Sequence, residues 1–532
     1  MRRPSTLVAL LFSSCLITSA CSGSGAGRHP SGPTRYADNG TFTMSQLDDT
    51  DGLDPYRTGT GLYLVGLAYD SLLNIRQDGT FVSGVAEKWS ADAHSATFTL
   101  RAGVTCADGT PLTAGQVAAD MNFVGDKANG SALYGRFTPP LPFRAAGDDK
   151  TGTITVNMVG KPFGFLLHTL GLLPIVCSKG LRDPKVLKHA TDGTGPYVLS
   201  KALPGQSYTF TVRKNYTWGP AGATTSRPGA PRTIVVRVIT NETTAANLLL
   251  AGDLNMAQVN GQDRLRLQAK GLKAIEAPQA GAWLFFNHRG ARPNADERVR
   301  RALVEALDRA QVVKVSTAQT GRAATGLTAL EPRACRGDTI AGNLPEHDVA
   351  GAEALLDQTG WTKGPDGVRV KDGKPLRIQL YYIPSFLPDG QAAAELVAQQ
   401  WHSVGIDVKV TAGTLTGLVQ VQKNGNFDVL LQPFNSNLPS RFVTLLSGPT
   451  PPQGTNFSGI GNQTYDNLVT KASSMTAPAS CTYWSQAEKA LFQAVNVAPI
   501  SERIGHYFLN RAEATINGTT TLPAPTSIRV LE

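Results

Sequence analysis

The sequence lacks the residue patterns that most catalytic and metal-binding sites require. None of its eight histidines stands in an H-x-H or H-E-x-x-H spacing, and neither a G-x-S-x-G turn nor a Gly-Lys-Ser/Thr phosphate loop occurs. Its six cysteines include no C-x-x-C pair, so neither a zinc site nor a redox pair is expected. These absences predict a protein that is not an enzyme and that uses no cofactor and no metal.

Strong charge of one sign is absent as well. Charged residues make up 17% of the chain, the formal net charge is +9 over 532 residues, and no dense run of Lys or Arg occurs. Because phosphate backbones are bound by clustered cations, nucleic-acid binding is not expected. The 41% of hydrophobic residues is typical of a folded protein. At this length a single core is unusual, so two or more lobes are predicted.

The N-terminus predicts export. Arg2 and Arg3 precede a short apolar segment over 7–17 and then Thr18-Ser19-Ala20-Cys21. This order is typical of a secretory signal peptide, and the apolar segment is too short to span a bilayer comfortably as a mature helix. We expect the signal at 1–20 and a Gly- and Ser-rich flexible tether over 21–35.

The residues before the cleavage point resemble a bacterial lipobox, which implies that Cys21 is the lipidated first residue of the mature protein. Thr18 stands where a lipobox usually has an aliphatic residue, so cleavage without lipid attachment is the alternative. With lipid, the protein would be anchored to the outer face of the cytoplasmic membrane.

The stretch 70–117 reads as a series of short elements. Residues 96–101 (ATFTLR) alternate apolar and polar side chains, as a half-buried strand does. Asp78-Gly79 and Asp108-Gly109 are turn sequences. Thr113 and Gln116 have the spacing of a capping box, which predicts a helix that begins after Thr113.

Six segments, in order, resemble those of the family 5 solute-binding proteins, the extracytoplasmic dipeptide- and oligopeptide-binding components of ABC importers. They are AEKWS (86–90), FTLRAGV (98–104), DGTPLTA (108–114), TDGTGPY (191–197), the 299–309 segment VRRALVEALDR, and HDVAGAEALLDQTGW (347–361). The resemblance covers most of residues 36–510.

This resemblance implies an α/β, two-lobed periplasmic-binding-protein-like fold with an enlarged first lobe. Lobe I would comprise 36–280 and be completed by 497–532, lobe II would comprise 281–496, and hinge strands near 279–283 would join them. A monomer is expected.

The clearest helix follows the expected hinge. Apolar residues recur at a spacing of three and four from Val299 to Val313, after a possible cap at Asn294–Asp296. We expect a solvated polar face on this helix, with Arg298, Arg300, Arg301, Asp308 and Arg309.

Four cysteines remain after the leader and Cys21, and they allow three pairings in an oxidising compartment. We favour Cys106–Cys177 and Cys335–Cys481, because each pair would then lie within one lobe.

Three stretches are candidates for ligand binding. The Leu-Asp-Pro element at 53–55 resembles one that leads into a cleft loop in the family, which makes Tyr56 and Arg57 candidates. The expected hinge strand adds Trp283, Phe286 and Asn287, and the segment after Phe427-Asp428 adds Phe434, Asn435, Asn437 and Arg441.

Asn437 is a departure from the family. Peptide binders of this family carry at that position an Asp that pairs with the α-amino group of the peptide. An amide supplies no countercharge, and charge-assisted hydrogen bonds are about twice as strong as neutral ones. Either another carboxylate meets the ammonium or the solute is not an ordinary peptide. Arg441 nearby could meet a carboxylate.

We therefore expect a lipid-anchored protein that captures a peptide or peptide-like solute and delivers it to ABC permease subunits. One alternative is a lipoprotein of the same fold that acts in the envelope through protein contacts without transport. Another is a binder of a non-peptide solute such as a metal chelate, a glycoside or an opine.

Overall fold

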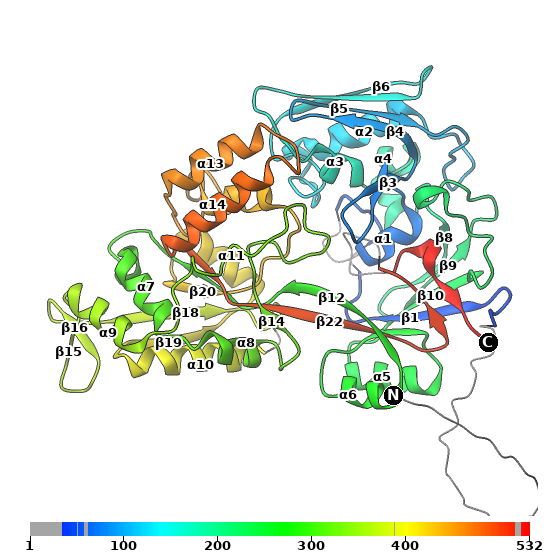
Figure 1. Ribbon diagram of the computed structural model, residues 1–532. Coiled ribbons are helices and arrows are strands. Elements are labelled where there is room, and N and C mark those ends of the chain that lie inside the picture. The colour runs from blue at the N-terminus through cyan, green and yellow to red at the C-terminus, as the bar shows by residue number, and fades with distance from the viewer. Residues whose placement is uncertain (1–34, 51, 58–61, 388, 517–522) are drawn as a thin grey trace, which may run out of the picture. The chain divides into compact units, whose positions relative to one another are not determined.

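The computed structural model describes residues 35–50, 52–57, 62–387, 389–516 and 523–532 (Figure 1). The expected signal peptide, Cys21 and nearly all of the expected tether lie outside the described residues. Residues 36–532 form one compact unit. The α/β fold class expected from the motifs is confirmed, since helices and strands are mixed along the whole unit.

The largest sheet has eight strands and brings together the start, middle and end of the unit. Its order is β12-β22-β11-β1-β10-β9-β8, with β14 paired to β22. Strand β10 has the β-branched sequence TIVVRV, and alternate residues Ile234 and Val236 are fully buried, as expected for a strand with one face on the core. The bounds are β1 (Thr41–Gln46), β8 (Tyr197–Leu203), β9 (Ser207–Val212), β10 (Thr233–Val238), β11 (Met256–Gln258), β12 (Lys273–Ala280), β14 (Arg322–Ala323) and β22 (Ser501–Leu509).

A second sheet has five strands in the order β19-β18-β20-β13-β21. Its strands are β13 (Trp283–Phe286), β18 (Arg377–Tyr382), β19 (Asp407–Ala412), β20 (Val429–Leu431) and β21 (Val497–Pro499). All residues of β13, β20 and the edge strand β21 are buried, so this side of the sheet is covered on both faces. Helix α10 (Gly390–Ser403) packs against β18 and β19.

Two of the points at which the chain crosses between the two sheets are neighbours, and the chain also reaches the first sheet at β14, between β13 and β18 of the second. It passes from β12 to β13 through Gly281 and Ala282, and returns from β21 to β22 through Ile500. The Gly281 N–H donates to Ser501 O at 2.8 Å, and the Ile500 N–H donates to Ala282 O at 2.9 Å. A Cβ on Gly281 would lie 2.4 Å from Ser501 Oγ, so glycine is required for this close approach.

The long helix expected over 299–313 is two helices, α7 (Glu297–Glu305) and α8 (Arg309–Ser316). Asp308 ends the continuity because its side chain accepts from the Gln311 N–H at 3.0 Å and caps α8. The expected solvated face is also wrong at Arg300. This side chain is 4% exposed, and its Nε donates to Val495 O at 2.8 Å.

A smaller, four-stranded antiparallel sheet runs in the order β4-β5-β7-β6, with α2 (Ala114–Gly125) against it. Its strands are β4 (Ala86–Ala91), β5 (Ser95–Leu100), β6 (Phe143–Asp148) and β7 (Thr153–Met158). Thr113 caps α2 by accepting from the Gln116 N–H at 3.2 Å. The reciprocal half of the predicted box is absent, because Gln116 Oε1 accepts from Ser178 Oγ while Nε2 donates to Val176 O at 3.0 Å.

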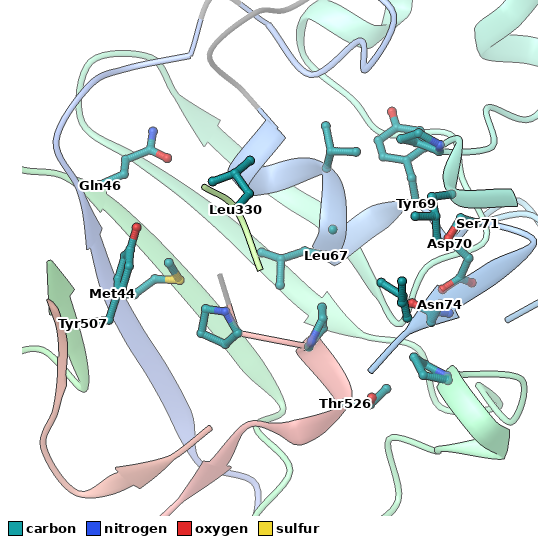
Figure 2. A pocket seen from close by; sticks show the side chains of 18 of the residues that line it. Met44, Gln46, Leu67, Tyr69, Asp70, Ser71, Asn74, Leu330, Tyr507 and Thr526 are labelled. Atoms are coloured by element: carbon teal, nitrogen blue, oxygen red, sulfur yellow. The ribbon is translucent and has the colours of Figure 1, made fainter. Parts of the chain in front are cut away.

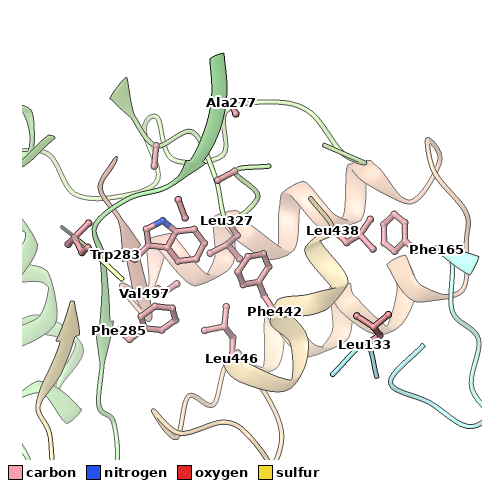
Figure 3. Packing of buried hydrophobic residues seen from close by; sticks show 14 of the residues in the cluster. Leu133, Phe165, Ala277, Trp283, Phe285, Leu327, Leu438, Phe442, Leu446 and Val497 are labelled. Carbon is pink, nitrogen blue, oxygen red and sulfur yellow. The ribbon is translucent and has the colours of Figure 1, made fainter. Parts of the chain in front are cut away.

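Two disulfides, Cys106–Cys177 and Cys335–Cys481, join the favoured pairs in the described part of the chain. Aromatic side chains pack in the core beside the second sheet, where Trp283 stacks on Phe285 at 5.9 Å and on Phe442 at 5.5 Å between ring centroids (Figure 3). The same cluster of buried residues continues to Leu438, Phe165 and Leu133.

Candidate functional site

A cavity of about 630 Å³ has walls from the eight-stranded sheet and from segments that connect the strands of both sheets (Figure 2). Strand ends of the eight-stranded sheet supply Gln46, Gln258 and Gln279, and the end of α1 (Leu62–Ala68) leads into Tyr69, Asp70 and Ser71. The wall also contains Leu330, Phe386 and Asn435, which lie in sequence between the crossings at 281–282 and at Ile500. Figure 2 shows Met44, Gln46 and Tyr507 at one end, and Tyr69, Asp70 and Asn74 at the other.

Uncharged amide side chains dominate the polar part of the cavity wall. They are Gln46, Asn74, Gln258, Gln279 and Asn435. Two of these are fixed by the fold, because Asn435 Oδ1 accepts from the Ala280 N–H at 2.7 Å and Gln279 Oε1 accepts from Arg503 Nη2 at 3.2 Å. The buried Nε2 of Gln46 has no hydrogen-bond partner among the described residues. Amides can donate and accept at once, so this wall suits a ligand with both kinds of group.

Besides the tyrosines, three ionisable side chains are found on the wall, and the hydrogen-bonding capacity of one of them is already used by the protein. The Asp70 carboxylate accepts from Tyr216 OH at 2.7 Å, Trp218 Nε1 at 3.0 Å and Thr194 Oγ1 at 3.1 Å. Burial raises the pKa of Asp70 to about 6, although these hydrogen bonds oppose the shift.

The other two ionisable side chains are Asp48 and Arg136. Asp48 is exposed, and its carboxylate forms no hydrogen bond or ion pair with any residue that the structure describes. The Arg136 guanidinium carbon lies 5.4 Å from the centroid of the Phe137 ring, which also lines the cavity.

Of the nine residues predicted to bind ligand, Asn435 lines this cavity. Tyr56 is 2% exposed, and its OH donates to Pro174 O at 2.8 Å within the core. Arg57 is exposed and lies 3.6 Å from the Asp54 carboxylate. Neither Tyr56 nor Arg57 is on the cavity wall.

The predicted hinge-strand residues lie in the core. Trp283, Phe286 and Asn287 are fully buried. The Asn287 amide holds neighbouring backbone, since Nδ2 donates to Gly425 O at 2.9 Å and to Phe427 O at 2.7 Å. These contacts give Asn287 a structural role that a motif alone does not reveal.

Phe434, Asn437 and Arg441 lie next to the cavity-lining part of their segment. The ring of Phe434 is 5.1 Å from that of Phe442, and the Arg441 guanidinium carbon lies 5.9 Å from the Phe434 centroid. Asn437 Nδ2 is buried and has no hydrogen-bond partner among the described residues.

Sequence reasoning missed the glutamines and Arg136. Gln46, Gln258 and Gln279 lie far apart along the chain, and they meet because β1, β11 and β12 are strands of one sheet. A polar residue at the end of a strand is a weak signal for a cavity wall, and no motif marks Arg136.

No helix within the described ranges is both long enough and apolar enough to cross a bilayer. Among the same residues, no group of three or more His, Cys, Asp or Glu side chains is placed to hold a metal ion.

Comparison with known proteins agrees with the fold. The family model "Bacterial extracellular solute-binding proteins, family 5 Middle" matches residues 80–452. The periplasmic murein peptide-binding protein MppA of Escherichia coli is 27% identical over 526 residues, which cover 91% of each chain. Protein XP55 of Streptomyces lividans is 31% identical over 343 residues, which cover 62% of this chain but only 58% of that protein.

A solved structure extends the likeness to nearly the whole chain. A substrate-binding protein of Microbacterium hydrocarbonoxydans, complexed with 4-hydroxybenzoate hydrazide, superposes with a TM-score of 0.72 at 24% identity and covers 92% of this chain and 99% of its own. Proteins of this family are extracytoplasmic solute-binding components of ABC importers rather than enzymes. The resemblance predicted from the motifs is therefore confirmed, and the chain belongs to the bacterial extracellular solute-binding proteins of family 5.

Proposed function

We propose that this protein captures a peptide or peptide-like solute in the amide-lined cavity and delivers it to the permease of an ABC importer. The observation that carries the proposal is the set of five amide side chains on a wall of about 630 Å³. A peptide backbone alternates donors and acceptors, and amide side chains can pair with both. The volume lies within the range of roughly 300–1,000 Å³ that small-molecule sites occupy.

The cavity would close by movement of two lobes. Lobe I would contain the eight-stranded sheet except β14, and lobe II the five-stranded sheet, with the division at the neighbouring crossings at 281–282 and at Ile500. Because β21 (497–499) pairs with β13 in the second sheet, we now place the return to lobe I after 499 rather than at 497. Two short crossings between rigid sheets are where hinge motion is usually absorbed.

A cationic group of the ligand would be met by Asp48, and an anionic group by Arg136 and the cation near it. Asp48 is the accessible carboxylate of the wall, so an ammonium group of the solute would lie beside it. Asp70 is less suited to this role, because three protein donors already occupy it.

A second candidate function is binding of a non-peptide solute. It is favoured by Asn437, which carries no countercharge for a peptide ammonium, and by the Microbacterium neighbour, whose ligand is 4-hydroxybenzoate hydrazide. The third candidate function is that of an envelope lipoprotein that acts through protein contacts without transport. In that case the cavity would hold no solute.

Native mass spectrometry of the mature chain, purified gently from its own host, separates these functions. A spread of bound masses that fragment as short peptides would support peptide capture, and each hit should raise the melting temperature. One discrete non-peptide mass would show that the solute is not a peptide. An empty protein that no peptide pool stabilises would support the third candidate function.

We also propose that Cys21 carries a lipid that anchors the mature chain to the membrane. In the native host, wild type should pellet with membranes, and Cys21→Ser should be released into the soluble or secreted fraction. A Cys21→Ser protein that still pellets with membranes would overturn the anchor.

A further inference from the structure

The Arg441 side chain is a partly buried cation without a carboxylate partner. It belongs to the short helical turn Pro439–Phe442, and its guanidinium carbon lies 5.9 Å from the ring centroid of Phe434. No Asp or Glu side chain of the described residues forms an ion pair or a hydrogen bond with it. An aromatic face offsets only part of the hydration that the cation loses.

A second cation, Arg136 on the cavity wall, lies near Arg441. Burial together with repulsion by Arg136 lowers the pKa of Arg441 to about 10. An anion placed against Arg441 would offset both effects.

The same segment holds two more polar atoms that lack partners. Asn437 Nδ2 and Ser440 Oγ are both buried and form no hydrogen bond with the described residues. An amide N–H and a hydroxyl can both donate to an oxyanion. Buried polar atoms are normally satisfied, so two of them in the segment that carries Arg441, which forms no ion pair with the described residues, indicate a missing acceptor.

The backbone of this segment is held in place beside the cavity. Ser436 O accepts from the N–H groups of Ala329 at 3.0 Å and of Leu330 at 3.1 Å, and Asn437 O accepts from the Ala334 N–H at 3.0 Å. Leu330 and Asn435 both line the cavity. The segment that carries these groups is therefore held beside the cavity on a rigid support.

We propose that Asn437, Ser440 and Arg441 form an oxyanion-binding end of the solute site and that this end receives a carboxylate of the ligand. The inference rests on the proposed function and deepens it. For a peptide, the C-terminal carboxylate would lie at the position where peptide binders of the family hold the ammonium, so the ligand would be bound in the reverse direction.

Isothermal titration with a mixed tripeptide pool in three forms tests this end of the site. The forms are free acid, C-terminal amide and N-acetyl. Wild type should bind the amide at least tenfold more weakly than the free acid, whereas the N-acetyl form should lose less, because only the contact with the exposed Asp48 is removed. Arg441→Gln should lose the preference for acid over amide and Arg441→Lys should keep part of it. Arg377→Gln, an exposed arginine away from the cavity, should behave as wild type. Equal binding of acid and amide by wild type would overturn the inference while leaving peptide capture intact.

A second measurement, made without any peptide, tests the inference even if no tripeptide binds and the proposed function fails. Sodium acetate should raise the melting temperature of wild type and Arg377→Gln above its value in sodium chloride at equal ionic strength, but not that of Arg441→Gln. Without added anion, Arg441→Gln should melt no lower than wild type, since it removes an unpaired cation. No difference between acetate and chloride would overturn the oxyanion site. A larger rise in sodium phosphate than in acetate would overturn its assignment to carboxylate.

Discussion

Asparagine side chains illustrate how one residue type serves either the core or the ligand site, depending on its surroundings. Asn287 is fully buried and spends its donors on two backbone carbonyls, whereas Asn435 is exposed, lines the cavity and accepts a single backbone N–H. Both were predicted to bind ligand. Because their environments differ, substitution of Asn287 should mainly change stability, and substitution of Asn435 should mainly change ligand affinity.

Asn287→Ala should lower the free energy of unfolding by roughly 2–4 kcal/mol, because it leaves buried carbonyls without donors. The ligand affinity of the remaining folded protein should change little. Asn435→Ala is the matched control, with a smaller loss of stability and a clear loss of affinity. Urea unfolding and calorimetric titration measure the two quantities. An affinity loss in Asn287→Ala with unchanged stability would contradict this assignment.

Asp70 gives a prediction about pH. The folded protein binds the Asp70 proton more tightly than the unfolded chain does, since burial raises its pKa to about 6 from an ordinary value of 3.8. The ionised carboxylate therefore favours unfolding above about pH 6, and this effect disappears below about pH 4. Relative to Asp70→Asn, wild type should lose roughly 2–3 kcal/mol of unfolding free energy between pH 4 and 7.

Chemical denaturation of wild type and Asp70→Asn at several values of pH provides the comparison. The other carboxyls are common to both proteins, so their contributions largely cancel in the difference. A difference that stays constant from pH 4 to 7 would show that Asp70 does not titrate in this range.

The segment that follows β14 links the cavity wall to the Cys335–Cys481 disulfide. It carries Leu330 on the cavity wall, and Cys335 ties it to Cys481 at the start of α14 (Cys481–Gln493). Arg336 Nη2 also donates to Gln77 O at 2.8 Å, across the proposed lobe boundary. The disulfide therefore holds part of the ligand wall as well as the core.

Replacing Cys335 and Cys481 together by serine should lower stability by about 2–4 kcal/mol. It should also weaken solute binding, because Leu330 and the backbone at Asn437 lose their tether. The matched control is the Cys106→Ser, Cys177→Ser variant, which should lose stability with a smaller change in affinity. Equal effects of both double variants on affinity would show that the tether does not act on the site.

At the scale of the whole molecule, contacts away from the two crossings bear on closure. Phe165 and Trp484 have ring centroids 5.8 Å apart, and a Cβ on Gly164 would lie 1.9 Å from Met475 O. These residues belong to different proposed lobes. Such contacts would form on closure and separate on opening.

Small-angle scattering should therefore show a smaller radius of gyration with solute than without it. Gly164→Ala should bind solute more weakly and contract less, because the added methyl group collides with the Met475 carbonyl. An unchanged radius of gyration in saturating solute would contradict lobe closure.

The sequence by itself determined the family, the α/β class and several local elements. The strand expected at 96–101 is β5 (Ser95–Leu100), and Thr113 caps α2. These features depend on neighbouring residues or on ordered motifs, so they can be read along the chain. The cysteine pairing was one of three that the sequence allowed, and the structure joins the favoured pairs.

Only the tertiary structure decided which polar residues meet. Gln46, Gln258 and Gln279 share a cavity wall because strands more than two hundred residues apart pair in one sheet. Helical spacing placed Arg300 in solvent, but backbone carbonyls near 494–495 bury it. The role proposed for Arg441 likewise depends on the tertiary structure, in which no carboxylate of the described residues packs against it. Burial and charge balance depend on contacts distant in sequence, and periodicity carries no record of them.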